Sequence, residues 1–143
     1  MWLIFAILDA LMAAISVTLT KAGLKNVNPF LAFALESILI LTISWSAVFF
    51  TGGQSEIGKI DKKAWIFLAC AGVATTLASL FQFRALKEGH AGGVSSIDRS
   101  SLVFTILFAT LFLKEKLTWQ LIVGGLLIVG GAVLIATVKQ EGK

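Results

Sequence analysis

The sequence predicts an all-α membrane protein, and three features of its composition carry this prediction. Hydrophobic residues make up 57% of the 143 residues, charged residues make up only 14%, and the mean hydropathy is +0.93. A typical soluble domain is about a quarter charged and just under half apolar. We therefore expect a single transmembrane domain over residues 1–143, without a separate soluble domain.

Five apolar runs are long enough to cross a bilayer, because a spanning helix needs about 20 residues. The first run has no basic region before it and no small-residue cleavage site, so we expect a spanning helix and not a signal peptide. The predicted architecture is polytopic, with five transmembrane helices at about residues 2–20, 30–50, 64–86, 93–113 and 118–138.

The segments between these runs explain where each helix begins and ends. Pro29 closes the segment KAGLKNVNP and suits the first position of the second helix. The segment TGGQSEIGKIDKK is the one sizeable loop and precedes the third helix. The pair Gly92–Gly93 separates the third helix from the fourth. The segment KEK allows only a tight turn, so we expect the last two helices to be antiparallel.

The basic residues are nearly balanced between the two sides of the membrane. Five spans place the termini on opposite sides, and the side of the N-terminus (side A) receives Lys59, Lys62, Lys63, Lys114 and Lys116. Side B receives Lys21, Lys25, Arg84, Lys87, Arg99, Lys139 and Lys143. If Arg99 is buried and the amino terminus is counted, the balance is about six against six. Since Lys and Arg set orientation, we expect insertion in both orientations and an antiparallel, dual-topology homodimer.

The four tryptophans lie toward side A. Trp2, Trp65 and Trp119 open helices there, and Trp45 lies toward the side A end of the second helix. Tryptophan favours the headgroup level, so an antiparallel pair of chains supplies aromatic belts at both interfaces. The alternative is plain anchoring of one interface, because aromatic belts need not be symmetric.

Four charged residues are expected at membrane depth, where a charge costs about 2.5–3.5 kcal/mol on insertion scales. Asp9 lies roughly 10 Å from side A at 1.5 Å per residue. Glu36, Asp98 and Arg99 lie roughly 8–9 Å from side B by the same rise. Residues of this kind usually line a bundle interior or an aqueous path.

Two roles compete for these side chains. In the structural role, Glu36 pairs with Arg99 to fix helix packing, and Asp98 caps the start of the fourth helix. In the functional role, Glu36 or Asp98 binds a proton and releases it when a cation or amine arrives. Asp9 can alternatively reach the headgroups. The remaining candidates for binding substrate or protons are Arg84, which can extend to the interface, and Ser96 and Ser100, whose hydroxyls suit a polar solute or helix capping.

Glycines recur along the fifth helix at Gly124, Gly125, Gly130 and Gly131. Small residues let transmembrane helices approach closely, so this face predicts either a dimer seam or packing on the fourth helix.

The sequence contains no catalytic constellation. His90 is the only histidine, and the serines of SSIDRSS have no histidine partner at membrane depth, so we expect no hydrolase triad and no enzyme. Cys70 is the only cysteine, which excludes an internal disulfide, and we expect neither a metal nor a cofactor. The charge of +4 is dispersed among the helix junctions, so nucleic-acid binding is not expected.

Four stretches resemble, in order, the motifs of one transporter family. They are TLTKAGLKNVNP, FQFRALKEGHAGGVSSID, LFLKEKLTWQ and GGLLIVGGAVLIA. Over nearly its full length the chain resembles a single EamA-type unit of the drug/metabolite transporter superfamily, in particular the short five-helix bacterial and archaeal members. By this resemblance the family positions are held by Lys21, Arg84, Ala85, Leu86, Gly89, Ile97, Asp98, Ser100 and Glu115, of which Lys21, Gly89 and Glu115 are expected to be structural.

The chain also departs from the family pattern. Arg99 stands where lysine is usual, and Lys114 stands where glycine is usual. Glu36 replaces a frequent arginine of the subgroup, and Ser79 replaces an aromatic residue. The charge at the second helix is thus inverted, so the substrates of relatives are a poor guide.

The resemblance implies a ten-helix functional unit built from inverted five-helix repeats, with a site near the midplane. Here a second copy of the chain would supply the second repeat. We expect a secondary transporter of a small polar or amphipathic metabolite or drug, coupled to protons, in the prokaryotic plasma membrane. The alternatives are a heterodimer with a similar chain, a non-transporting membrane partner subunit, and a flippase for a lipid-linked substrate.

Overall fold

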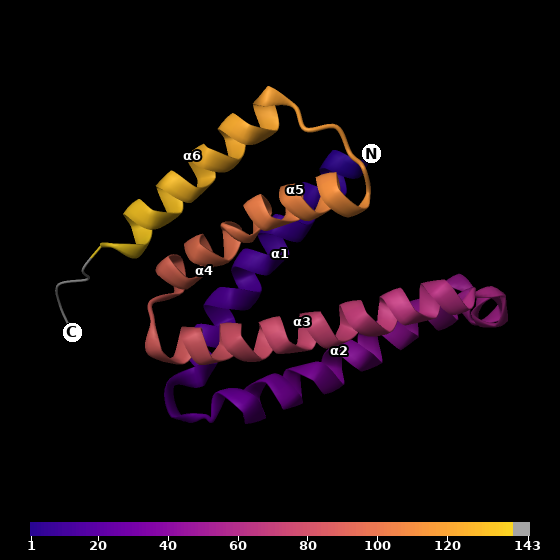
Figure 1. Ribbon diagram of the computed structural model, residues 1–143. Helices are drawn as coiled ribbons and strands as arrows, with labels where there is room; N and C mark the ends of the chain where they lie inside the picture. Colours follow the sequence, from indigo (N-terminus) through magenta and orange to yellow (C-terminus); the bar gives the residue numbers. More distant parts are fainter. Residues whose placement is uncertain (139–143) are drawn as a thin grey trace. The chain divides into compact units, whose positions relative to one another are not determined.

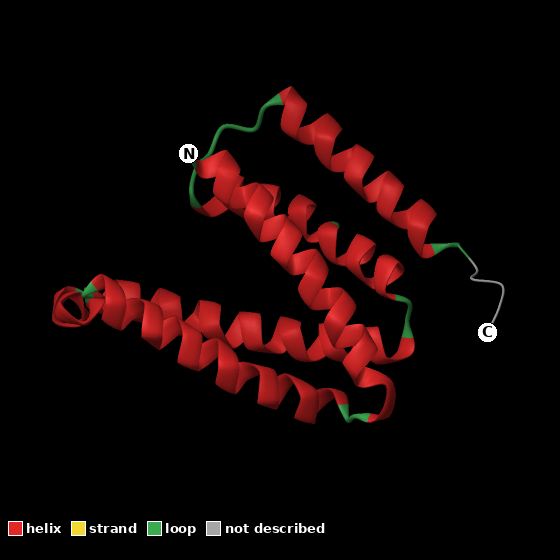
Figure 2. Ribbon diagram, turned by 180° about the vertical axis from the view of Figure 1, so that it is seen from behind, coloured by secondary structure: helices red, strands yellow, loops and turns green. Residues whose placement is uncertain are grey.

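The computed structural model describes residues 1–138, and this part of the chain contains helices and no strands (Figure 2). The helices, in order, are α1 (Trp2–Gly23), η1 (Leu24–Asn26), α2 (Pro29–Thr51), η2 (Gly53–Lys59), α3 (Lys62–Glu88), α4 (Ala91–Arg99), α5 (Ser101–Phe112) and α6 (Trp119–Ala136). Two of the basic residues counted for side B, Lys139 and Lys143, lie outside the described residues.

Five helical segments of the described chain are long and apolar enough to span a membrane. They are Trp2–Asn26, Pro29–Thr51, Lys62–Glu88, Ala91–Phe112 and Trp119–Ala136. Their bounds follow the predicted ones closely, and the all-α polytopic fold class is confirmed.

The fourth segment differs from the prediction, because it is two helices and not one. The backbone N–H of Ser100 donates to the Ile97 carbonyl at 2.9 Å, which closes α4 before α5 begins at Ser101. The segment also begins earlier than predicted, since His90 is the N-cap residue and Ala91 the first helical residue. Figure 1 shows α4 and α5 following one another along the chain.

The chain divides into two compact units. Unit 1 comprises Met1–Lys21 and Glu88–Lys143, and unit 2 comprises Ala22–Lys87. The single domain expected over residues 1–143 stays a prediction.

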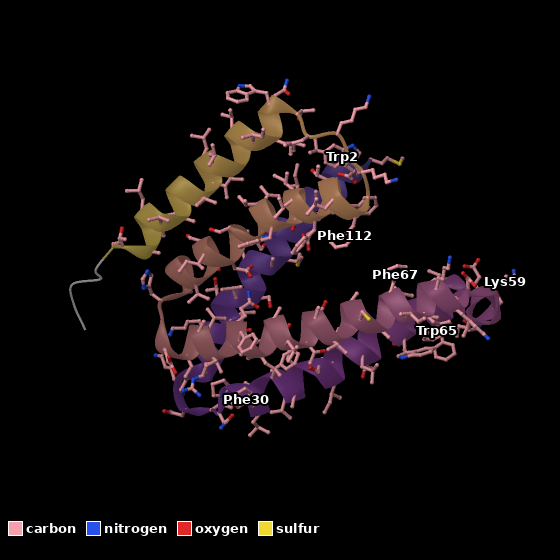
Figure 3. All side chains as sticks on the ribbon, in the orientation of Figure 1. Trp2, Phe30, Lys59, Trp65, Phe67 and Phe112 are labelled. Atoms are coloured by element: carbon pink, nitrogen blue, oxygen red, sulfur yellow. The ribbon has the colours of Figure 1, made fainter. Side chains whose placement is uncertain are left out.

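Unit 2 is a hairpin of α2 and α3, which run side by side in Figures 1 and 2. The Asn28 side chain caps α2 by accepting from the N–H of Phe30 at 2.9 Å, and Pro29 takes the first helical position as predicted. Gly52 ends α2 with φ of +73°, a conformation that glycine adopts without strain. Figure 3 shows Lys59 and Trp65 together at this end of the hairpin.

The other end of unit 2 contains its best-packed residues. The rings of Phe33 and Phe83 meet edge to face with centroids 5.3 Å apart. Leu24, Phe83 and Leu86 are all buried. Leu24 belongs to η1, so this short helix contributes a fully buried side chain.

Lys87 completes the same end of unit 2 with polar contacts. Its ammonium group donates to the carbonyls of Leu24, Lys25 at 2.8 Å and Val27 at 3.2 Å. The three N–H donors of a lysine are thereby matched to three acceptors of one turn.

Hydroxyl groups along α2 bond back to the helix itself. Ser37, Thr42, Ser44 and Ser46 each donate to the carbonyl four residues earlier, at 2.6–2.8 Å. A polar group in lipid must be satisfied internally, so these bonds let α2 carry hydroxyls across the membrane.

In unit 1, α4 packs closely against α6. Gly93 on α4 and Ala132 on α6 are buried, as expected where small residues let helices approach. The turn between α5 and α6 contains Lys114 with φ of +57°, the left-handed region that favours glycine. The family resemblance expects glycine at this position, and the backbone geometry gives the physical reason.

Candidate functional site

The acidic and basic residues predicted at membrane depth fall into both units. Asp9 lies in α1, and Asp98 and Arg99 are the last two residues of α4, all exposed in unit 1. Glu36 lies in α2 of unit 2, half-buried and one turn beyond Phe33. The predicted pairing of Glu36 with Arg99 joins two units and stays a prediction.

Asp98 does not cap a helix, so the capping role predicted for it is wrong. The helix α4 begins seven residues before Asp98, and neither α4 nor α5 has a side-chain capping bond. The reason is that the helix starts directly after His90, which places Asp98 in its last turn.

The two candidate serines take different places. Ser96 is occupied locally, since its hydroxyl donates to the Gly92 carbonyl at 2.7 Å. Ser100 lies at the break between α4 and α5, where it is half-buried. Arg84 is an exposed residue of α3 in unit 2.

An open pocket of about 380 Å³ lies beside the break, between the start of α5 and the middle of α6. It is lined by Arg99, Ser101, Leu102, Thr105 and Ile128. Arg99 was predicted from the sequence, whereas Ser101 and Thr105 were not. Their spacing of four residues places them on one face of α5, and a hydroxyl pair at this spacing, beginning two residues after Arg99, was the available sequence signal.

A second groove of about 300 Å³ runs between α5 and α6, and its lining is almost entirely apolar. Thr110 is the one polar side chain in its wall. The Thr110 hydroxyl donates to the Ile106 carbonyl at 2.8 Å, so it offers the groove no free donor. This groove suits a hydrocarbon chain and not a polar solute.

The glycines of α6 divide into two kinds. A Cβ atom on Gly125 would lie 3.5 Å from Val103 and 3.7 Å from Ile106 of the same chain, so this glycine serves packing on α5. A Cβ atom on Gly124, Gly130 or Gly131 would meet nothing within 4 Å in the described residues. A role in a dimer seam therefore stays a prediction for Gly124, Gly130 and Gly131. For Gly125, packing on α5 is a sufficient explanation.

Two of the predicted structural residues are brought together in unit 1. The Lys21 ammonium donates to the Gly89 carbonyl at 2.7 Å, which joins the end of α1 to the residues before α4. Glu115 lies in the α5–α6 turn, where its backbone N–H donates to the Ala109 carbonyl at 3.3 Å. Among residues 1–138, no group of three or more His, Cys, Asp or Glu side chains is placed to hold a metal ion.

Comparisons with known proteins agree with this architecture. The model of the EamA-like transporter family matches residues 1–137. A protein of Sinorhizobium sp. described as an uncharacterized transporter in the cobO 3′ region is 36% identical over 135 residues, which cover 94% of this chain and 96% of that protein. No solved structure matches.

A more distant relative is an uncharacterized solute carrier family 35 member of Schizosaccharomyces pombe. It is 24% identical over 138 residues, covering 94% of this chain and 27% of that protein, so the chain spans about a quarter of its length. The five spans, the full-length family match and the two transporter-named relatives lead to one conclusion: the chain belongs to the EamA-like transporter family and is a multi-pass membrane transporter of this type.

Proposed function

We propose that the chain works as an antiparallel, dual-topology homodimer that transports a small polar or amphipathic metabolite or drug across the prokaryotic plasma membrane. The observation that carries the proposal is the near-balance of positive charges across an odd number of spans: about six on side A, with the amino terminus, against seven on side B when the exposed Arg99 is counted. Two inverted copies give ten helices, and alternating access rocks one copy against the other around a central site.

The burial of side chains supports a second copy. Among the described residues the buried hydrophobic side chains are only Leu24, Phe83, Leu86 and Ala132. Most apolar surface is thus left for lipid, for the other unit of the chain or for a second chain. In this proposal Gly124, Gly130 and Gly131 of α6 belong to the seam between copies, because the space beside them is open.

Topology reporters test the orientation. A reporter active only in the cytoplasm and one active only outside, each fused at the C-terminus, are both expected to give signal. If one reporter is silent, the antiparallel homodimer is excluded, and a similar chain of opposite orientation is the partner to seek.

Proton coupling through Glu36 or Asp98 is part of the proposal, because an acid at membrane depth is usually functional. In proteoliposomes, Glu36→Gln or Asp98→Asn should reduce proton-driven flux to background. Glu56→Gln, in the loop helix η2 outside the spans, is the matched control and should leave flux unchanged. Unchanged flux in both membrane variants would assign these acids to packing alone.

The apolar groove between α5 and α6 favours a second candidate function, the movement of a lipid-linked substrate. Scrambling of a fluorescent lipid in the same proteoliposomes separates the two candidates. If neither solute nor lipid moves while the dimer forms, the chain is a non-transporting partner subunit.

A further inference from the structure

The pocket beside the α4–α5 break combines a cationic residue with hydroxyl residues and an apolar wall. Its lining includes the cationic residue Arg99 and the hydroxyl residues Ser101 and Thr105, which share one face of α5. Leu102 and Ile128 supply the apolar part of the wall and are 38% and 40% exposed, so they remain available for contact.

The charge of Arg99 has no ion-pair partner in the described part of its own unit. Among the described residues of unit 1, no carboxylate forms an ion pair with Arg99. Asp98 is its neighbour in sequence, but consecutive residues of a helix do not face each other, and Asp98 is not part of the pocket lining. An unneutralised guanidinium at membrane depth is unfavourable, and an anionic ligand would remove that penalty.

The two hydroxyls complement the guanidinium. The Thr105 hydroxyl donates to the Ser101 carbonyl at 3.1 Å, a long bond that an anion can replace. The Ser101 hydroxyl bonds to no other described residue and remains a free donor. A planar guanidinium binds the two oxygens of a carboxylate or phosphate in parallel, and a hydroxyl alongside adds a third donor.

We propose that this pocket binds the oxyanion, carboxylate or phosphate, of an amphipathic molecule whose apolar part lies against Leu102 and Ile128. The inference rests on the proposed transport function and narrows its substrate class to amphipathic anions. An anion in this pocket comes from one of two sources, a free solute or the headgroup of an anionic lipid.

Binding to the purified full-length protein in phosphatidylcholine nanodiscs tests the proposal. Hexanoate and phenyl phosphate should raise the thermal unfolding midpoint, while the neutral hexanamide and the cationic hexylamine should not. Arg99→Gln should weaken hexanoate binding about 10- to 100-fold, because charge-assisted hydrogen bonds are lost. Lys116→Gln removes the same charge from the exposed α5–α6 turn and should leave binding unchanged.

A second variant keeps the test independent of folding defects. Ser101→Ala combined with Thr105→Val retains every charge and should weaken hexanoate binding several-fold, about the loss of one or two neutral hydrogen bonds. Equal responses to hexanoate and hexanamide, or unchanged binding in Arg99→Gln, would overturn the proposal.

The lipid arm identifies the source of the anion. If replacing phosphatidylcholine by phosphatidylglycerol raises the midpoint through Arg99 and displaces hexanoate, the oxyanion is a lipid headgroup. If hexanoate binds with equal affinity in both lipids, the oxyanion that occupies the pocket is a free solute. Either result supports an oxyanion site.

Flux measurements separate this inference from the proposed function. Arg99-dependent hexanoate binding without flux of any solute leaves the oxyanion site standing and removes the transport proposal. If hexanoate and hexanamide are transported at equal rates, the oxyanion site is excluded and the transport proposal stands.

Discussion

The two units differ in how completely their turns and helix ends are satisfied. In unit 2 the carbonyls of η1 receive the Lys87 ammonium, Asn28 caps α2, and Gly52 takes the positive φ at its end. In unit 1, α4, α5 and α6 all begin without a side-chain cap. Unit 1 also holds Lys114 at positive φ and both pockets.

This difference indicates where to look for function. Proteins satisfy local rules where the chain is scaffold and break them at functional or strained sites. The α2–α3 hairpin has the features of a scaffold, and the region from α4 to α6 has those of a working surface. Substitutions in both units test this contrast between scaffold and working surface.

Leu24→Ala should have the largest effect, because the Leu24 side chain in η1 of unit 2 is only 1% exposed. Removing a buried leucine typically lowers the free energy of unfolding by about 2–5 kcal/mol. Reversible unfolding in mixed micelles measures the change. Leu126→Ala is the control on α6, where the side chain is 67% exposed, and its effect should stay within about 0.5 kcal/mol. Equal losses in both variants would contradict the contrast between the units.

Lys87→Met should follow, since it keeps the apolar stem and removes the ammonium that binds the η1 carbonyls. Hydrogen bonds to a charged donor contribute about 1.5–3 kcal/mol, which is the expected loss in the free energy of unfolding. Lys63→Met, at the exposed start of the same helix, is the matched control. If only Lys87→Met lowers the free energy of unfolding, the loss comes from the contacts of Lys87 with the turn and not from the change in net charge.

Gly93 and His90 should show energetic coupling at the start of α4. A Cβ atom on Gly93 would lie 2.5 Å from Nε2 of His90, so the imidazole must move in Gly93→Ala. In a double-mutant cycle, the cost of Gly93→Ala should fall by about 1 kcal/mol when His90 is first replaced by alanine. Additive costs would show that the imidazole already lies elsewhere.

Lys114→Gly should have the smallest effect and the opposite sign. The left-handed conformation of Lys114 disfavours a residue with a Cβ, so glycine should raise the free energy of unfolding by about 0.5–1 kcal/mol. Thermal unfolding of the two proteins side by side measures it. Lys116→Gly, in the same turn but without positive φ, should give no such gain.

The sequence was sufficient for the spans and insufficient for the pocket. The apolar runs and Pro29 set the helices to within a few residues, because run length and helix-start residues are local properties. The Gly92–Gly93 pair, expected between the third and fourth helices, lies instead inside α4, which already begins at Ala91. The break between α4 and α5 at Ser100 has no proline or glycine nearby from which it could be predicted. The pocket could not be predicted either, since it needs Ile128 of α6 beside α5, which is a matter of tertiary packing.

The contacts of Lys21 and Lys87 affect which sequence changes the neighbouring turns can tolerate during evolution. Both ammonium groups bind main-chain oxygens, those of Gly89 and of the η1 turn. A carbonyl is present whatever side chain the residue carries, so mutation at positions 24, 25, 27 or 89 does not delete the acceptor. Through these main-chain contacts the two lysines can hold the backbone while the residues of the turns change in sequence.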